Sequence, residues 1–338
     1  MKNDLLLAAV GATVGTAYLH ESEEPSCFAG YLVRVRPDIS KVLPRFLGYW
    51  TQSAEYWAQI RAGAIGSTIE NFSASRYKAM IVRLPPPEDQ VRIATFLDRE
   101  TAQIDAFIAD QVELIGLLAE RRAGTIESVF DRAVDRKPLR NTIAIAQTGP
   151  FGTQLSATEY VSGGTPVLNP THIQQGRIEV DNDVSVTPET AAVLSRFAFV
   201  VGDIVLGRKG EVDKSALIDE THAGAICGSD SMLIRPDRWT NPRYLWWFFQ
   251  SVGAHGQLER WSVGSTVSGL NQNTISQIRV PYGDENFQAL CVHDLDAEIG
   301  ELDAAIVDAR QAMMLSRERR AALISAAVTG KIDVPSAA

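Results

Sequence analysis

The sequence contains few of the residues that build disulfides, metal sites or cofactor sites. It has three cysteines, Cys27, Cys227 and Cys291, and their spacing does not match that of a zinc site. Such a sparse and odd number favours a reduced, cytoplasmic chain. We find no Walker A motif, no glycine-rich dinucleotide fingerprint and no nucleophile elbow. The sequence therefore predicts a protein without a cofactor, without a metal and without catalysis of its own.

Long apolar runs are also missing. No segment approaches the 18 or more unbroken apolar residues of a membrane-spanning helix, so we expect no membrane partner. Residues 1–19 place a lysine before an apolar run, as signal peptides do, but Asp4 interrupts the start of that run. This run also repeats an internal segment, which favours a strand over a signal peptide.

An excess of basic charge is absent as well. The chain has 32 Lys and Arg against 41 Asp and Glu, and its net charge is −9. The acidity is concentrated in two segments, with 6 basic and 11 acidic residues in 88–136 and 5 basic and 10 acidic residues in 284–338. The remaining segments are near neutral. A protein that binds DNA through bulk charge should be basic, so this chain would need local basic loops or a partner that supplies charge.

An internal repeat is the strongest signal in the chain. "AIGSTIENF" (64–72) matches "SVGSTVSGL" (262–270), and "DLLLAAVG" (4–11) matches "DIVLGRKG" (203–210). "VRVRPD" and "PRFLGYW" in the first copy match "SMLIRPD" and "PRYLWWF" in the second. Residues 4–133 therefore repeat as roughly 203–331, and the chain is a tandem of two similar units.

The two copies differ at their beginnings. Residues 137–202 precede the second copy and have no counterpart before the first, so we expect the first unit to lack about 60 residues that the second has. A start site placed too far downstream, a gene truncation and a natural half-module would each produce this difference.

Each unit is expected to end in a long helix. Apolar residues recur at heptad spacing in both copies, which predicts two helices of about 40 residues, each roughly 60 Å long. These residues are Leu97, Ile104, Ile108, Ile115, Leu118 and Val129 in the first copy, and Leu295, Ile299, Leu302, Ile306, Ala309, Met313 and Leu323 in the second. Because the second helix would return along the first, we expect an antiparallel coiled coil. The alternative is two amphipathic helices that each pack on their own domain.

These segments, in this order and repeated twice, resemble the specificity subunit (HsdS) of type I restriction-modification systems. The resemblance rests on the "GST…IRVP" block, the acidic-Gln or acidic-Asn step (Asp89-Gln90, Glu285-Asn286), the heptad helix and the closing "ERRAALISAAVTGKID". "GPFGTQLSATEYVSGGTPVLNPTHI" (149–173) resembles the start of one of the target recognition domains of that family.

The resemblance implies an α+β fold, a tandem repeat of small α/β target recognition domains joined by the two long helices. It implies a truncated first recognition domain at 1–87, a first helical region at 88–136, a complete second recognition domain at 137–283 and a second helical region at 284–338. It also implies a non-catalytic subunit whose partners are double-stranded DNA, the methyltransferase subunits and, through the complex, the restriction subunit.

Polar loops of the complete domain supply the candidate DNA-binding residues. Glutamine and asparagine amides can pair with adenine, and basic side chains bind phosphate. The candidates are Thr153, Gln154, Ser156, Asn169, His172, Arg208, Lys209, Lys214, Thr266, Asn271, Gln272 and Asn273. For each there is a plainer alternative: Arg208-Lys209 could be an ordinary solvated turn, the 149–160 loop a structural turn, and His172 a structural histidine.

The acidic residues of the helices, including Asp98, Asp105, Asp296 and Asp303, should avoid DNA and face a protein partner or solvent.

Three functions fit this reading. The first is a DNA-specificity subunit that positions an adenine methyltransferase and, through it, a restriction subunit. The second is an assembly protein that binds methyltransferase subunits without reading a full bipartite site. The third is the specificity chain of a related nuclease-methyltransferase.

Overall fold

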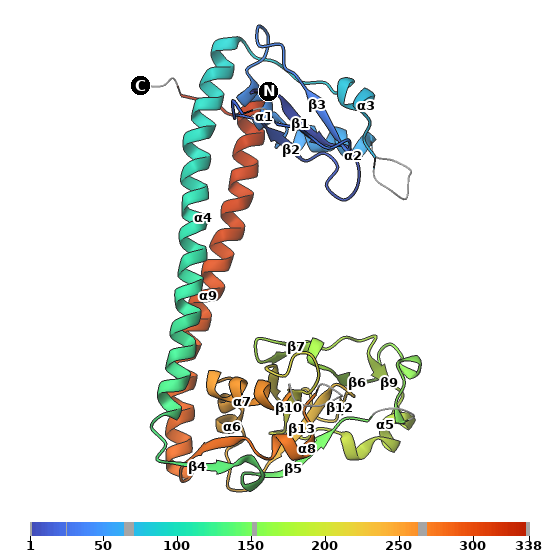
Figure 1. Cartoon of the computed structure of the whole chain (residues 1–338), viewed down its shortest axis with the longest axis vertical. Coiled ribbons are helices and arrows are strands. Elements are labelled where there is room, and N and C mark those ends of the chain that lie inside the picture. The colour runs from blue at the N-terminus through green and yellow to red at the C-terminus, as the bar shows by residue number, and fades with distance from the viewer. Residues whose placement is uncertain (1, 25, 64–70, 151–153, 263–268, 336–338) are drawn as a thin grey trace. The chain divides into compact units, whose positions relative to one another are not determined.

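The computed structural model describes residues 2–24, 26–63, 71–150, 154–262 and 269–335 (Figure 1). The chain divides into two compact units. The first unit holds residues 1–116 and 307–338, and the second unit holds residues 117–306. Each unit therefore contains one globular part together with portions of two long helices.

The globular part of the first unit is a small antiparallel sheet with short helices. Its elements are β1 (Leu5–Ala8), β2 (Ala17–Leu19), β3 (Leu32–Val35), α1 (Pro44–Trp50), α2 (Ala54–Gly63) and α3 (Ala74–Lys78). The strand order is β2-β1-β3, with Leu5 opposite Val35 and Leu7 opposite Val33. The N-terminal apolar run is therefore a strand, as the repeat predicts.

The second unit has more strands. They are β4 (Asp135–Pro138), β5 (Ile143–Thr148), β6 (Thr165–Leu168), β7 (Ile173–Gln174), β8 (Arg177–Ile178), β9 (Ser185–Val186), β10 (Ile204–Gly207), β11 (Ser215–Leu217), β12 (Ile226–Cys227), β13 (Ser231–Pro236) and β14 (Arg279–Tyr282). The main sheet is antiparallel with the order β11-β10-β13-β5. A smaller sheet has the order β12-β6-β9, and β14-β4 and β7-β8 form two further pairs.

Short helices complete the second unit, and their starts follow from the sequence. They are α5 (Pro188–Val193), α6 (Pro242–Phe249), α7 (Val252–Ser262) and α8 (Gln272–Ile275). The Asn241 side chain caps α6 by accepting hydrogen bonds from the backbone N–H groups of Arg243 and Tyr244 at 2.9 and 3.3 Å. Pro242 follows at the first helical position, where its missing N–H costs nothing. An Asn-Pro pair before an apolar run is a recognised helix-start signal.

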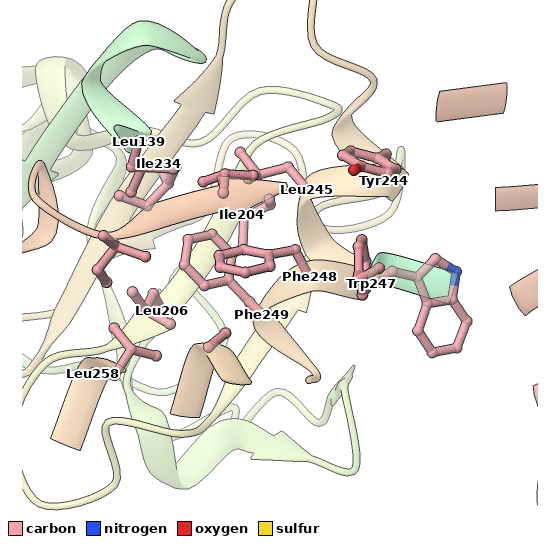
Figure 2. Close-up of a cluster of buried hydrophobic side chains, with 14 of the residues drawn as sticks. Leu139, Ile204, Leu206, Ile234, Tyr244, Leu245, Trp247, Phe248, Phe249 and Leu258 are labelled. Carbon is pink, nitrogen blue, oxygen red and sulfur yellow. The ribbon is translucent and has the colours of Figure 1, made fainter. Parts of the chain in front are cut away.

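The main sheet of the second unit is buried on both faces. Ile204, Leu206 and Ile234 belong to a core with Phe248 and Phe249 of α6, and Figure 2 shows these side chains gathered around the strands. A second core lies on the other face, because alternate strand residues point to opposite sides of a sheet. Val205, Ala216 and Leu233 belong to it.

The first unit has one core where the second has two. Among the described residues of the first unit, Leu7, Val33 and Val35 pack into a single cluster with the short helices and the long-helix ends. On the opposite face of this sheet, Arg34 occupies the position of Leu233 and is exposed. Among its described residues, the sheet of the first unit thus has an apolar core on one side only.

The two predicted long helices are α4 (Pro87–Phe130) and α9 (Glu285–Val328), and they lie side by side (Figure 1). In the second unit Arg122 of α4 bonds to Asp303 of α9 at 3.0 Å. In the first unit Arg320 of α9 bonds to Asp105 of α4 at 2.9 Å. The prediction of an antiparallel coiled-coil arrangement is confirmed, since the start of each helix pairs with the end of the other.

Both units repeat one buried glutamine contact. The Gln90 amide accepts a hydrogen bond from the N–H of Leu43 at 2.7 Å and donates to the carbonyls of Lys41 and Pro85. Gln288 makes the same three bonds in the second unit, to Asn241, Trp239 and Gly283. Both glutamines are 1% exposed. The true counterpart of Gln90 is therefore Gln288, and the pairing of Asp89-Gln90 with Glu285-Asn286 was wrong by two residues.

A buried carboxylate is repeated in the same way. Asp203 at the start of β10 is fully buried and accepts two hydrogen bonds from Arg235, both 2.7 Å long. Asp4 before β1 is 2% exposed and accepts two from Arg36, at 3.0 and 3.3 Å. Its hydrogen bond with the Arg36 guanidinium holds the pKa of Asp4 below its usual value. Asp4 thus belongs to the framework of the sheet.

The acidic residues of the helices hold the globular parts to the helices. Asp98 accepts a hydrogen bond from Tyr49 at 2.7 Å and pairs with Arg45. Asp296 accepts one from the indole N–H of Trp247 at 2.8 Å and pairs with Arg243 at 2.6 Å. Asp105 and Asp303 pair with arginines of the opposite helix. All four carboxylates also keep 33–53% of their side chains exposed, so the solvent-facing part of the prediction stands beside these internal contacts.

Candidate nucleic-acid interface

The turn between β10 and β11 carries three of the predicted site residues, Arg208, Lys209 and Lys214. The turn is tight: a side chain on Gly207 would place its Cβ 1.9 Å from the carbonyl oxygen of Glu211, so only glycine fits. The N–H of Gly207 closes the turn with a 2.7 Å hydrogen bond to the carbonyl of Lys214. The sequence prediction of a turn after this strand is confirmed.

Arg208 is directed into the protein, not to an exposed tip. Its Nε donates to the carbonyl of Leu270 at 2.7 Å, and its Nη1 lies 3.3 Å from the carbonyl of Ser229. Its backbone N–H and C=O bond to Asp230 and Leu270. Arg208 therefore ties three loops together by donating to carbonyls that need a donor, and it is half-buried, unlike a residue of an ordinary solvated turn.

The two lysines of the turn lie beside carboxylates. Lys209 has 41% of its side chain exposed, and its Nζ is 3.5 Å from Asp230. Lys214 has 23% exposed and bonds to Glu211 at 2.8 Å. The turn therefore presents mixed charge, and Lys209 is the lysine better exposed for an added anion. This acidic chain would need local basic loops for DNA binding. In this turn, acidic neighbours offset the positive charge of the two lysines.

The first turn of α8 lies against this turn. Leu270 is fully buried, and its N–H donates to the carbonyl of Arg208 at 2.9 Å. The Asn271 side chain caps α8 by accepting from the N–H groups of Asn273 and Thr274, each at 3.0 Å. Asn271 is thus occupied as a cap. Gln272 and Asn273 follow it and are exposed, so their amides are available to a ligand.

Glycines bring two further segments to the same place. A Cβ on Gly149, at the end of β5, would lie 1.9 Å from the carbonyl oxygen of Gly228. A Cβ on Gly228 would lie 2.0 Å from Oδ1 of Asn169. The turn 227–230 also carries the carbonyl of Ser229 that Arg208 contacts. The end of β5, the segment after β6, the β10–β11 turn and the start of α8 therefore converge.

Asn169 and His172 support one another. Nδ1 of His172 accepts a hydrogen bond from the N–H of Asn169 at 3.2 Å, and His172 is 8% exposed. The close contact of Asn169 with Gly228 holds its side chain in the same framework. This arrangement corresponds to the structural alternative for His172.

The loop after β5 carries the remaining described candidates. Gln154 and Ser156 are exposed, while Leu155 between them is buried in the second core. The N–H of Ser156 donates to Glu159 at 2.7 Å, which starts a short 3₁₀ turn. Thr153 and Thr266 lie outside the described residues, as do the Gly-Ser-Thr blocks of both copies.

Sequence reasoning missed Ser229 and Asp230, which border Lys209 and receive Arg208. The small and acidic residues of "CGSDS" are typical of a turn before a strand, and that signal could have drawn attention to them. Burial raises the pKa of the neighbouring Cys227 thiol, which therefore stays protonated and unreactive. Within the described ranges no group of three or more His, Cys, Asp or Glu is placed to hold a metal.

A search of the described helices for membrane spans finds none with the length and apolar character that crossing a bilayer requires. The long helices α4 and α9 carry charged residues throughout.

Comparison with known proteins points to one family. Residues 1–114 match the model of the type I restriction modification DNA specificity domain. The type I restriction enzyme StySPI specificity subunit of Salmonella potsdam is 24% identical over 174 residues, which is 49% of this chain and 36% of that protein. The match thus spans about a third of the length of that relative. The resemblance to type I specificity subunits is therefore confirmed.

A solved structure with a TM-score above 0.5 shares the fold. A chain from a structural study of complex assembly and conformational transition in the type I R-M system has a TM-score of 0.71 and 14% identity, and the match covers 98% of this chain and 83% of that one. The type I S subunit from M. genitalium is 15% identical with a TM-score of 0.48, covering 100% of this chain and 84% of that one.

Proposed function

We propose that this chain, with its confirmed resemblance to type I specificity subunits, is the DNA sequence-specificity subunit of a type I restriction-modification complex. It acts by binding and positioning, and the partner subunits perform the chemistry. We place its recognition domains at 1–87 and 137–283 and its helical regions at 88–136 and 284–338.

One observation carries this proposal, the convergence of four loop segments in the second unit. They are held by Arg208 and by close glycine contacts, and they leave Lys209, Gln272 and Asn273 exposed at one place. Rigidly held amides can discriminate bases, and a lysine beside them can contact phosphate. Asn169, His172, Arg208 and Asn271 serve as the supporting framework of this site.

A gel-shift assay with the chain reconstituted with methyltransferase subunits tests the site. Gln272→Ala and Asn273→Ala should each reduce discrimination between target and mismatched DNA by about 1–3 kcal/mol. Lys209→Ala should weaken binding to all sequences and lower the slope of log K against log salt by about 0.9. Arg140→Ala removes an exposed positive charge from the same unit and serves as the control. Unchanged discrimination in both amide variants would contradict the assignment of Gln272 and Asn273 as base-reading residues.

Docking of methyltransferase subunits is proposed for the helices. Within the first unit, α4 and α9 expose large apolar side chains, which is typical of a protein interface. They are Phe107, Val112 and Leu114 on α4 and Val307, Met314 and Leu315 on α9. The double substitution Met314→Glu with Leu315→Glu should abolish co-purification with methyltransferase subunits. Val193→Glu, at an 82% exposed position of the second unit, should leave it unchanged.

A second candidate function is an assembly protein that binds methyltransferase subunits without reading a full bipartite DNA site. It is favoured by the first unit, where Ala9 and Val10 stand at the positions of Arg208 and Lys209. The backbone contact is retained, since the N–H of Phe72 donates to the carbonyl of Ala9 at 2.8 Å, but the basic side chains are absent. Binding of methyltransferase subunits without preference for any DNA sequence would select this function.

A further inference from the structure

An exposed ion pair joins Lys209 of the β10–β11 turn to Asp230 of the turn before β13. The Lys209 Nζ lies 3.5 Å from Oδ1 of Asp230, and 41% and 50% of the two side chains are exposed. The stem of Lys209 packs against the backbone, since a Cβ on Gly269 would lie 3.0 Å from its Cγ. The two charges are therefore held at the surface, where an exposed pair contributes little to stability and opens readily.

The pair lies beside the exposed amides of the candidate nucleic-acid interface. Arg208 connects the two places, because its backbone N–H donates to the carbonyl of Asp230 at 2.8 Å and its Nε donates to the carbonyl of Leu270 at 2.7 Å. Gln272 follows Leu270 by two residues and is exposed. One set of bonded loops therefore presents a lysine, a carboxylate and an amide.

The first unit keeps the backbone of this arrangement and has neither charge. The strand register sets Tyr31 at the position of Asp230. Val10 stands at the position of Lys209. The backbone bond across the turn is retained, since the N–H of Ala9 donates to the carbonyl of Tyr31 at 2.9 Å. The turn thus forms without the ion pair, which indicates that the pair in the second unit serves a function other than folding.

We propose that Asp230 is a specificity-determining residue, whose carboxylate accepts a hydrogen bond from a base amino group of the DNA target. This inference rests on the proposed DNA-binding function of the second unit. When Lys209 turns to a phosphate, Asp230 loses its cation. A carboxylate accepts hydrogen bonds and donates none, and the donors in the major groove are the N4 amino group of cytosine and the N6 amino group of adenine.

DNA that lacks such an amino group at this position leaves the carboxylate unpaired beside the phosphates. An unpaired charge weakens binding to the wrong sequence and so adds to the discrimination that favourable contacts provide. Asp230 therefore lowers the affinity for arbitrary DNA, and the hydrogen bond to the base offsets this loss on the target alone. The mixed charge of the turn then increases specificity at the expense of non-specific affinity.

Competition gel shifts with the chain reconstituted with methyltransferase subunits test the role of Asp230. The probes are a duplex of random sequence and the duplex that the wild-type complex selects from a randomised pool. Asp230→Asn should bind the random duplex about two- to fivefold more tightly, because a negative charge beside the phosphates is removed. The preference for the selected duplex over the random one should fall about 5- to 30-fold.

A second selection from the pool, made with the variant complex, localises the effect. Asp230→Asn should relax the preference for cytosine or adenine at one base pair and keep the preferences at the others, because an amide both donates and accepts hydrogen bonds. Asp213→Asn is the matched control, since it removes an exposed carboxylate from the same turn. It should affect the two duplexes equally and leave the selected sequence unchanged.

Three results would overturn the inference while the DNA-binding function stands: a wild-type preference in Asp230→Asn, a preference that weakens evenly at all base pairs, or the same loss of preference in Asp213→Asn. A wild-type complex that selects no sequence from the pool would overturn both the inference and the proposed function. The two failures are therefore distinguishable.

Discussion

The two units of this chain share a polar framework but differ in what covers their sheets. Gln90 and Gln288 make the same three hydrogen bonds, and Asp4 and Asp203 each hold an arginine. On the outer face, however, the second unit has a whole additional core, whereas the first has the exposed Tyr18 and Arg34. The two units therefore keep the same buried polar contacts, although only the second unit has a second apolar core on the outer face of its sheet. The polar contacts do not depend on that second core.

The largest expected difference between the units concerns the buried carboxylates. Asp203→Ala should cost about 2–4 kcal/mol of unfolding free energy, because Arg235, with 31% of its side chain exposed, and the N–H of Val200 both lose the buried carboxylate that they bond to. Asp4→Ala should cost about 1–2 kcal/mol, because Arg36 is 54% exposed and water can solvate it. Urea unfolding, with hydrogen exchange to resolve the units, measures both.

The double variant Asp203→Ala with Arg235→Ala provides the control. It removes the unpaired charge and should recover part of the loss. Equal losses of unfolding free energy for Asp203→Ala and Asp4→Ala would show that the second core does not strengthen the buried ion pair, and would contradict the expected difference between the units.

The next effect is expected from a substitution that removes a contact found only in the second unit. Leu139→Ala should destabilise the second unit by about 2–5 kcal/mol, because a fully buried leucine leaves a cavity against Ile234 and Ile278. The exposed Val134→Ala is the matched control and should change stability by less than about 0.5 kcal/mol. Chemical denaturation measures both. A loss below about 1 kcal/mol would mean that the sheet holds its shape without this cover.

Much of the framework could be predicted from the sequence, because the repeat covers β1, β3 and the short and long helices of the first unit together with their counterparts in the second. Asp4 and Asp203 head matching strands, and Arg36 and Arg235 stand in matching "RPD" segments, so even their pairing was within reach. The Asn271-x-x-Thr274 spacing is a recognisable capping pattern, which would have identified Asn271 as a cap and not a reader.

The fate of Arg208 could not be predicted in this way. The sequence predicts a turn there, but it does not reveal that the carbonyl of Leu270, 62 positions later, lies within 2.7 Å of the guanidinium. Contacts between loops distant in sequence depend on how the strands pack. Lys209, next to it, is one of the candidates that stay exposed, and whether it contacts DNA stays a prediction.

A smaller effect should be equal in the two units. Gln90→Ala and Gln288→Ala each leave one N–H and two carbonyls without their partner, at a cost of about 1–3 kcal/mol. Because both side chains are 1% exposed and make matching bonds, the two losses should agree within about 0.5 kcal/mol. The free energy of unfolding by urea measures each. Unequal losses would indicate that the shared framework is weaker in the unit with the single core.

The smallest expected effect concerns the ion pairs between the long helices. Arg122→Ala and Arg320→Ala each remove one partly exposed pair, with Asp303 and Asp105, and exposed pairs contribute about 0.2–1 kcal/mol. The two arginines differ in their second contact. Arg122 lies over the Trp247 ring at 5.8 Å, whereas Arg320 donates to the Gln52 side chain at 3.0 Å.

Because of this difference, added salt should change the stability losses of the two substitutions by different amounts. A cation over an aromatic ring adds about 0.5–1 kcal/mol, and in this partly buried position it is screened less than an exposed ion pair. Raising the salt from 0.1 to 1 M should therefore reduce the loss caused by Arg320→Ala toward zero and leave part of the loss caused by Arg122→Ala. Thermal unfolding at both salt concentrations measures it, with Trp247→Leu as a background in which the two arginines should become alike. If the losses already agree in the wild-type background at high salt, the ring contact adds nothing, and the repeated ion pairs are equivalent in both units.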